Sequence, residues 1–297
     1  MTTPPAADPG TVLRDATAAM RQGNLPVAAA LAATATERFR AKADADGRMR
    51  SENLLGAVAF ETGQVGDAEA YFGAALELAQ TLGDSQMTAR ASNNLASVAH
   101  LTGRPEVALS LYRTALLSYQ RLGDRRGMAE TSHNLGIAFR QLGQWSDAER
   151  AAEEAVRHAD VSGDAALRAL VLIGRAELHL EREAWPIAAR EIERAAALAA
   201  EAGDQIGAVE AGRLRALLHL GRGEGVEALT VALASRAEAD KLGSALLAAE
   251  CTMAAARAAR VAGRTGEADR LRADAESRLT QLGAAGLLQR LTNEWGA

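Results

Sequence analysis

The chain has 297 residues, a formal net charge of −5 and 48% hydrophobic residues. The hydrophobic fraction excludes a disordered chain, and the acidic balance argues against nucleic acid or an acidic membrane surface as a partner. Cys251 is the only cysteine, so an intrachain disulfide is excluded and a reducing, cytoplasmic location is expected. The first ten residues lack a basic start and an apolar stretch, so we expect no secretory signal.

Small residues recur every 40 positions along almost the entire chain. The three series are Gly23, Gly63, Gly103, Gly143, Gly223 and Gly263; Ala28, Ala68, Ala108, Ala148, Ala188, Ala228 and Ala268; and Gly83, Gly123, Gly163, Gly203, Gly243 and Gly283. A fixed period of this length is typical of a solenoid, in which each repeat buries its apolar face against its neighbours. We therefore expect an all-α fold, a right-handed superhelical solenoid of about seven antiparallel helical hairpins.

The expected elements follow in chain order. We predict a flexible N-terminal tail over 1–8, seven repeats over 9–283, and a C-terminal capping helix and tail over 284–297. The first helices of the repeats are expected near residues 9, 49, 89, 129, 169, 209 and 249, and the second helices near residues 25, 65, 105, 145, 185, 225 and 265. The apolar run that follows Gly283 is expected to cover the final repeat, which would otherwise expose its apolar face.

Residues 89–128 illustrate how one repeat is built. Apolar residues follow a helical spacing up to Gly103, where glycine can adopt the left-handed conformation that ends a helix. Pro105 suits the first turn of the second helix, and Asp124 can cap the helix that comes next. Ala108 and its counterparts mark positions where two helices cross closely, so that a larger side chain would force them apart.

These marks resemble the tetratricopeptide repeat. Its hallmarks are a Leu-Gly or Leu-Ala pair in the first helix, then a small residue, an aromatic residue and a second small residue in the second helix. In this sequence they are Leu55-Gly56, Leu95-Ala96, Leu135-Gly136, Ala68, Ala108, Ala148, Phe72, Tyr112, Ala75, Ala115 and Ala155. The consensus repeat has about 34 residues; the longer form is similar to that of LGN/Pins-type polarity adaptors, kinesin light chains and sensor domains of bacterial transcription activators. Later repeats depart from the pattern at Arg175, Glu183 and Arg215.

The resemblance implies that the first helices line a concave groove that holds an extended or helical peptide. Polar residues gather at the groove positions of repeats two to four, and we predict that they bind a peptide. They are Arg50, Asn53, Arg90, Asn93, Asn94, Ser97, His100, His133, Asn134 and Arg140. Asparagine amides both donate and accept, as a peptide backbone requires, and arginine matches carboxylates. The alternative is that these residues are solvated, or that asparagine pairs bridge adjacent repeats. Groove positions in the later repeats are more apolar, and they could hold apolar side chains of the same ligand or simply be packed.

The sequence therefore predicts a non-catalytic scaffold that binds an extended, partly acidic peptide or protein tail. The alternative is a regulatory sensor domain that changes superhelix shape on binding a signal peptide or small ligand and controls an effector in trans. We expect no enzyme activity, no cofactor, no metal site, and neither nucleic acid nor membrane as a partner. The apolar C-terminal segment with Trp295 leaves self-assembly through the terminal repeats open. His179 and His219 share one repeat position and are expected to pack between helices rather than to bind metal.

Overall fold

The computed structural model describes residues 8–22 and 24–296, so Gly23 and most of the predicted N-terminal tail lie outside the described residues. The described residues form fifteen helices and no strand. In chain order the helices are α1 (Pro9–Arg21), α2 (Leu25–Ala41), α3 (Ala45–Glu61), α4 (Val65–Leu82), α5 (Ser85–Leu101), α6 (Pro105–Leu122), α7 (Arg125–Gln141), α8 (Trp145–Ser162), α9 (Ala165–Glu181), α10 (Trp185–Ala202), α11 (Gln205–Gly221), α12 (Gly225–Lys241), α13 (Ala245–Val261), α14 (Thr265–Gln281) and α15 (Ala285–Gly296).

The second helices begin at the predicted residues, whereas the first helices after α1 begin one turn earlier than predicted. The reason is the aspartate that precedes most of them, because its carboxylate accepts a hydrogen bond from the third following residue and thereby caps the helix. Asp84 Oδ1, for example, accepts from the Met87 backbone nitrogen at 2.9 Å, and Asp44, Asp124 and Asp204 cap their helices in the same way.

The turns that join the helices from α2 to α15 require a left-handed residue, which explains the described members of both glycine series. Gly123, at the end of α6, has a φ of 69°. Glu183 stands where other repeats have glycine, and it adopts the same conformation with a φ of 59°. The turn is therefore kept in this repeat, at the conformational cost that a side chain brings in this region.

The alanine series explains why the hairpins pack closely. Ala28, Ala68, Ala108, Ala148, Ala188, Ala228 and Ala268 are all at most 2% exposed. Helix backbones approach each other at these positions, and the apolar face of each hairpin is buried against the next. The predicted fold class, an all-α superhelical solenoid of antiparallel hairpins, is confirmed.

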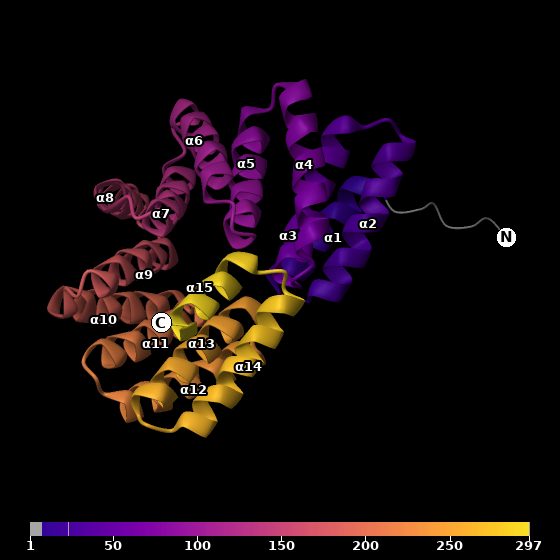
Figure 1. Cartoon of the computed structure of the whole chain (residues 1–297). Coiled ribbons are helices and arrows are strands. Elements are labelled where there is room, and N and C mark those ends of the chain that lie inside the picture. The colour runs from indigo at the N-terminus through magenta and orange to yellow at the C-terminus, as the bar shows by residue number, and fades with distance from the viewer. Residues whose placement is uncertain (1–7, 23, 297) are drawn as a thin grey trace.

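The array curves so far that its last helices return to its early repeats (Figure 1). One apolar cluster contains Val65 and Leu101 from the early repeats together with Leu279, Leu282 and Leu291 from the end of the chain. The turn of Gly63, with a φ of 77°, packs so closely on Leu282 that an added Cβ would lie 2.4 Å from its Cδ2. This contact joins the two ends of the superhelix.

The C-terminal helix packs on the final repeat, where the sequence predicts a capping helix, and it reaches further than the sequence predicts. α15 lies on the concave side of the array and contacts α5 as well as α14 (Figure 1). Gly286 lies against Gly103, and an added Cβ on Gly286 would be 3.2 Å from the Gly103 Cα. The curvature of the array brings these two turns together, so that Leu291 is buried inside the groove while Leu287, Leu288 and Trp295 are partly buried. Among the described helices none is both long and apolar enough to cross a membrane.

Candidate functional site

Asparagines on three adjacent first helices form a hydrogen-bonded ladder along the concave face. Asn94 Nδ2 on α5 donates to Asn53 Oδ1 on α3 at 3.2 Å. Asn134 Nδ2 on α7 donates to Asn93 Oδ1 at 3.4 Å, and the Thr131 hydroxyl donates to the same oxygen at 3.1 Å. These bonds are the bridges between repeats that the sequence left open as an alternative, and they hold the amides in fixed orientations.

Four of the eight side-chain amide atoms in the ladder make no hydrogen bond to the described residues. Within the described part of the chain, no hydrogen bond engages Nδ2 of Asn53 or Asn93, or Oδ1 of Asn94 or Asn134. None of these four atoms is among the fully buried unpaired ones, so they remain open to the groove or to solvent. Two donors and two acceptors on neighbouring helices match the alternating N–H and C=O groups of a peptide backbone.

The ladder borders an open groove of about 820 Å³ between α1, α3, α5 and α7. Half of the predicted site residues line this groove, namely Arg50, Asn53, Arg90, Asn93 and Asn94. Asn134 and Ser97 do not line it: Asn134 bridges to Asn93, and Ser97 hydrogen-bonds the Tyr112 hydroxyl at 3.1 Å. The structure thus gathers part of the predicted site and uses another part for packing.

The arginines of this groove differ in how far they are neutralised. Arg50 Nε pairs with Asp46 at 3.0 Å on the same helix. Arg90, in contrast, has no carboxylate within 4 Å among the described residues; it lies near Tyr119, whose pKa burial raises to about 12. Arg14 on α1 has no carboxylate partner within the described part of the chain and donates to the Thr11 hydroxyl at 2.9 Å. Two guanidinium groups in the groove therefore remain available for a carboxylate.

The other three predicted residues, His100, His133 and Arg140, lie beneath α15 at a smaller hollow of about 180 Å³. Burial is the main cause that lowers the pKa of both histidines to about 4, and the nearby Arg140 contributes to this shift. Both imidazoles are therefore neutral at pH 7. His100 Nε2 lies 3.3 Å from Gln141 Nε2, while its buried Nδ1 has no hydrogen-bond partner.

A buried chain of ion pairs, which we did not predict, continues from Arg140 across the later repeats. Glu177 Oε2 accepts from Arg140 Nη2 at 2.7 Å, and Glu177 Oε1 accepts from Arg213 Nη1 at 3.1 Å. Burial alone would raise the pKa of Glu177, but the arginines, Arg140 and Arg213 foremost, hold it well below its usual range. Arg213 Nε is also bonded to Glu210 at 3.0 Å. The available signal was the alternation of Arg and Glu at groove positions of consecutive repeats.

Glu250 is the unusual member of this group. Its carboxylate makes no hydrogen bond among the described residues, and its nearest cation is Arg213 Nε at 4.0 Å. Burial raises the pKa of Glu250 to about 7, with Glu210 and Glu177 adding to the rise and Arg213 and Arg290 opposing it.

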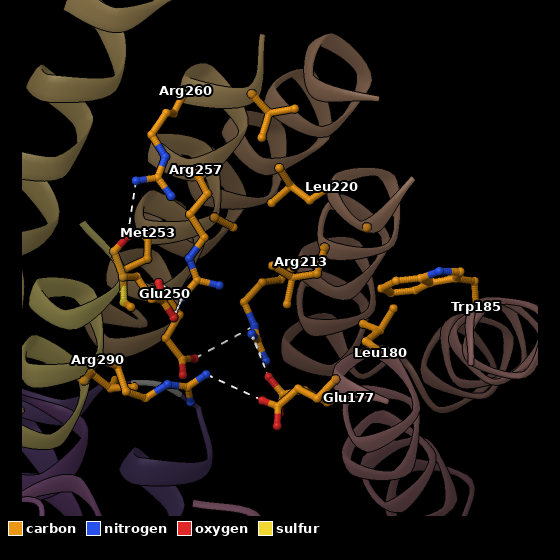
Figure 2. A pocket seen from close by; sticks show the side chains of 17 residues that line it. Glu177, Leu180, Trp185, Arg213, Leu220, Glu250, Met253, Arg257, Arg260 and Arg290 are labelled. Carbon is orange, nitrogen blue, oxygen red and sulfur yellow. Dashed lines mark hydrogen bonds and ion pairs between the residues drawn. The ribbon is translucent and has the colours of Figure 1, made fainter. Parts of the chain in front are cut away.

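Glu250 and Arg213 face a cavity of about 460 Å³ between α9, α11, α13 and α15 (Figure 2). Leu180, Leu220 and Met253 supply apolar walls. These are later groove positions for which the sequence left open either ligand contact or packing. The structure places them at a cavity that α15 closes on one side.

The histidines that share a repeat position pair with carboxylates instead of with each other. His179 Nε2 lies 3.7 Å from Glu191, and His219 Nδ1 lies 2.5 Å from Glu224. In the part of the chain that is described, no group of three or more His, Cys, Asp or Glu is placed to hold a metal ion.

Stacked helical hairpins with polar side chains along a continuous concave face define a helical-repeat solenoid. A tetratricopeptide repeat family model matches residues 87–160, and the marks of that repeat extend beyond this stretch. Residues 87–160 are therefore tetratricopeptide repeats, and the hairpins before and after them have the same architecture. A search of curated proteins gives no match to the sequence.

Solved structures share this fold at low sequence identity. A Rap protein complexed with competence and sporulation factor is 15% identical, with a TM-score of 0.79, over 92% of this chain and 75% of that one. Aspartyl phosphate phosphatase F from Bacillus subtilis is 14% identical, with a TM-score of 0.61, over 99% and 94% of the two chains. The apo form of the quorum sensor NprR from B. thuringiensis is 12% identical, with a TM-score of 0.60, over 96% and 85%. At these identities the likeness is one of fold.

Proposed function

We propose that this protein binds an extended peptide or protein tail along the asparagine ladder, in the groove between α1, α3, α5 and α7. The observation that carries the proposal is the set of unused amide atoms on Asn53, Asn93 and Asn94, which line an open groove of about 820 Å³. Because the ladder fixes these amides in advance, a ligand loses little free energy in ordering them.

The charges of the groove favour a ligand that is partly acidic. Among the described residues Arg14 and Arg90 have no carboxylate partner. The carboxylates of Asp46 and Glu130 are paired with Arg50 and Arg126, and those of Asp44 and Asp124 accept backbone hydrogen bonds as helix caps. A peptide carboxylate would therefore find a free guanidinium, while a lysine or arginine side chain would find the acidic groups already engaged. The ten residues predicted from the sequence remain candidates. α15 covers three of them, His100, His133 and Arg140, so a ligand contacts these three only if α15 leaves space for it.

A regulatory role is favoured over a passive scaffold by the closure of the superhelix. The cluster that holds Leu101, Leu282 and Leu291 joins distant repeats, so a ligand that changes the pitch of the array must also change this contact. The Rap protein noted above is complexed with competence and sporulation factor, and NprR is a quorum sensor. We therefore propose a peptide-responsive regulator that acts on an effector in trans, in a cytoplasmic setting.

We further propose that this chain acts by binding and not by catalysis. The fold alone does not decide this, since one similar structure is a phosphatase. The groove of this chain presents amides and guanidiniums, and its carboxylates are paired with arginine or cap helices. Its single thiol, Cys251, is buried, and burial raises its pKa to about 12, which keeps it in the unreactive protonated form.

The test begins with peptides selected from a display library on the immobilised full chain. Their affinities are then measured by fluorescence polarisation for the wild type, for Asn93→Ala/Asn94→Ala and for the control Gln120→Ala, which changes an exposed residue of α6. The double substitution removes two backbone-directed hydrogen bonds worth about 1 kcal/mol each, so we expect affinity to fall about tenfold or more. Equal affinity for the wild type and the double variant, with the control unchanged, would show that the ligand lies elsewhere.

A further inference from the structure

The surface beneath α15 holds this helix through a specific apolar pattern. Leu291 is fully buried in the cluster that also contains Leu101. The ring of Trp295 lies beside two guanidinium groups, that of Arg260 at 4.5 Å and that of Arg272 at 5.6 Å from its centroid. Such contacts between an aromatic face and a cation are favourable when both are partly shielded from water.

Polar contacts set the direction and register of α15. The Glu294 carboxylate pairs with Arg257 on α13, and Arg260 Nη1 donates to the Glu294 carbonyl oxygen at 3.2 Å. Arg290, one turn earlier, lies 3.6 Å from Glu181 on α9. A helix placed here in the opposite direction would put its acidic group beside Glu181 and its basic group beside Arg257.

The helix is nevertheless seated loosely. Leu291 is the one buried side chain among those described within α15, whereas α13 beneath it has eleven buried residues. Arg290 lines three separate hollows beside α15, of about 460, 590 and 180 Å³. These hollows are open and not enclosed, so α15 lies on the concave surface as a docked helix and is not surrounded as a core element is.

The residues of α15 also divide the concave face in two. Leu287 and Arg290 line the small hollow over His100, His133 and Arg140, while the open part of the groove lies on the other side. A ligand that runs from Asn93 toward Arg140 meets α15 in its path. Removal of α15 would make one continuous surface from α1 to α13.

We infer that the surface beneath α15 is a docking site for an amphipathic helix, which α15 fills in cis and which a helix of a partner protein takes in its place. The partner helix that fits carries apolar residues at the spacing of Leu287, Leu291 and Trp295, with a basic and an acidic residue at the spacing of Arg290 and Glu294. Apolar anchors four residues apart on one helix face are the usual means of recognition in such grooves. This inference deepens the proposed function. Only one part of it rests on that proposal, namely that α15 also controls the length of the peptide groove.

α15 and the partner helix compete for the same surface, and this competition determines how tightly the partner helix binds. A tethered segment acts at an effective concentration in the millimolar range. The apparent affinity for a helix in trans is reduced by the fraction of molecules in which the site is free. Weakening α15 therefore increases binding in trans without any change in the site itself.

The experiment uses the full chain and a fluorescein-labelled peptide with the sequence of residues 284–297. Its affinity is measured for the wild type, for Leu291→Ala/Trp295→Ala and for the control Asn293→Ala, which changes an exposed residue of α15. We expect the double variant to bind the peptide at least tenfold more tightly than the wild type or the control. The same peptide with Leu287→Ala, Leu291→Ala and Trp295→Ala should not bind.

A second variant, Glu294→Arg, opposes the pairing with Arg257 and leaves the apolar residues of α15 in place, and it should also increase binding. Equal binding by the wild type and both variants, or no binding by either variant with its helix content intact, would overturn the inference. So would loss of cooperative unfolding in both variants, because α15 would then be part of the core. Sedimentation equilibrium measures whether the wild type is a dimer at micromolar concentration. A dimer would overturn the assignment to a partner protein, because the docked helix would then come from a second copy of the chain. None of these readouts involves the asparagine ladder, so this inference and the proposed function can fail separately.

Discussion

Replacement of Glu250 by glutamine should stabilise the protein, and the gain should grow with pH. The carboxylate lies among Arg213 and Glu210 of α11, Glu177 of α9 and Arg290 of α15, without a hydrogen bond of its own. Its pKa of about 7 in the folded protein exceeds the unfolded value of 4.5. The destabilisation is therefore absent below pH 4.5 and complete once the pH rises above 7.

The difference of about 2.5 pKa units corresponds to about 3 kcal/mol above pH 7 and to about 1 kcal/mol at pH 5. Urea unfolding of the wild type and Glu250→Gln at pH 5 and pH 8 measures both quantities. The stability advantage of the variant should increase by about 2 kcal/mol between these pH values. Glu201→Gln, which changes an exposed residue of α10, serves as the control. Parallel pH profiles for the wild type and Glu250→Gln would refute the reasoning.

Three further substitutions test other parts of the structure. Glu177→Ala leaves the guanidiniums of Arg140 and Arg213 buried without their shared partner, and urea unfolding at pH 7 should show a loss of about 3–5 kcal/mol; a loss below 1 kcal/mol would contradict the buried network. Ala108→Leu should lower the melting temperature, because overpacking at this fully buried position costs about 1–3 kcal/mol, and a melting curve like that of the wild type would show that the two helices do not cross there. Arg90→Ala should leave the melting temperature unchanged and weaken the binding of acidic selected peptides, with a smaller effect at high salt because exposed charges are screened; an equal loss at low and high salt would exclude the electrostatic role.

The repeat architecture could be predicted from the sequence because each hairpin depends on local marks. Glycine at the turn and alanine where helices cross act within one repeat, so the period reveals them without knowledge of distant contacts. The first helices after α1 begin directly after an aspartate or serine at the N-cap, as α5 does after Asp84, whereas the apolar spacing that predicts them starts one turn later.

The position of α15 could not be predicted in the same way. It depends on the curvature accumulated over all the repeats, which brings Leu282 beside Gly63 and Gly286 beside Gly103. No local mark records that curvature. The same contact explains why the ten predicted groove residues are divided, with Asn94 at the open groove and Arg140 beneath α15.

The charged network had a detectable signal in the sequence. Arg140, Glu177, Arg213 and Glu250 occupy groove positions of four consecutive repeats, and their charges alternate in sign. Residues at groove positions of adjacent repeats are neighbours in a solenoid, so alternating charges indicate pairing across repeats.

The most direct test of the central claim is a crystal structure of the full chain with a peptide selected by display. We predict that the peptide backbone lies in the groove between α1, α3, α5 and α7 and hydrogen-bonds to the free amide atoms of Asn53, Asn93 and Asn94. A peptide bound on the convex face, or in the groove without contact to these amides, would contradict the claim.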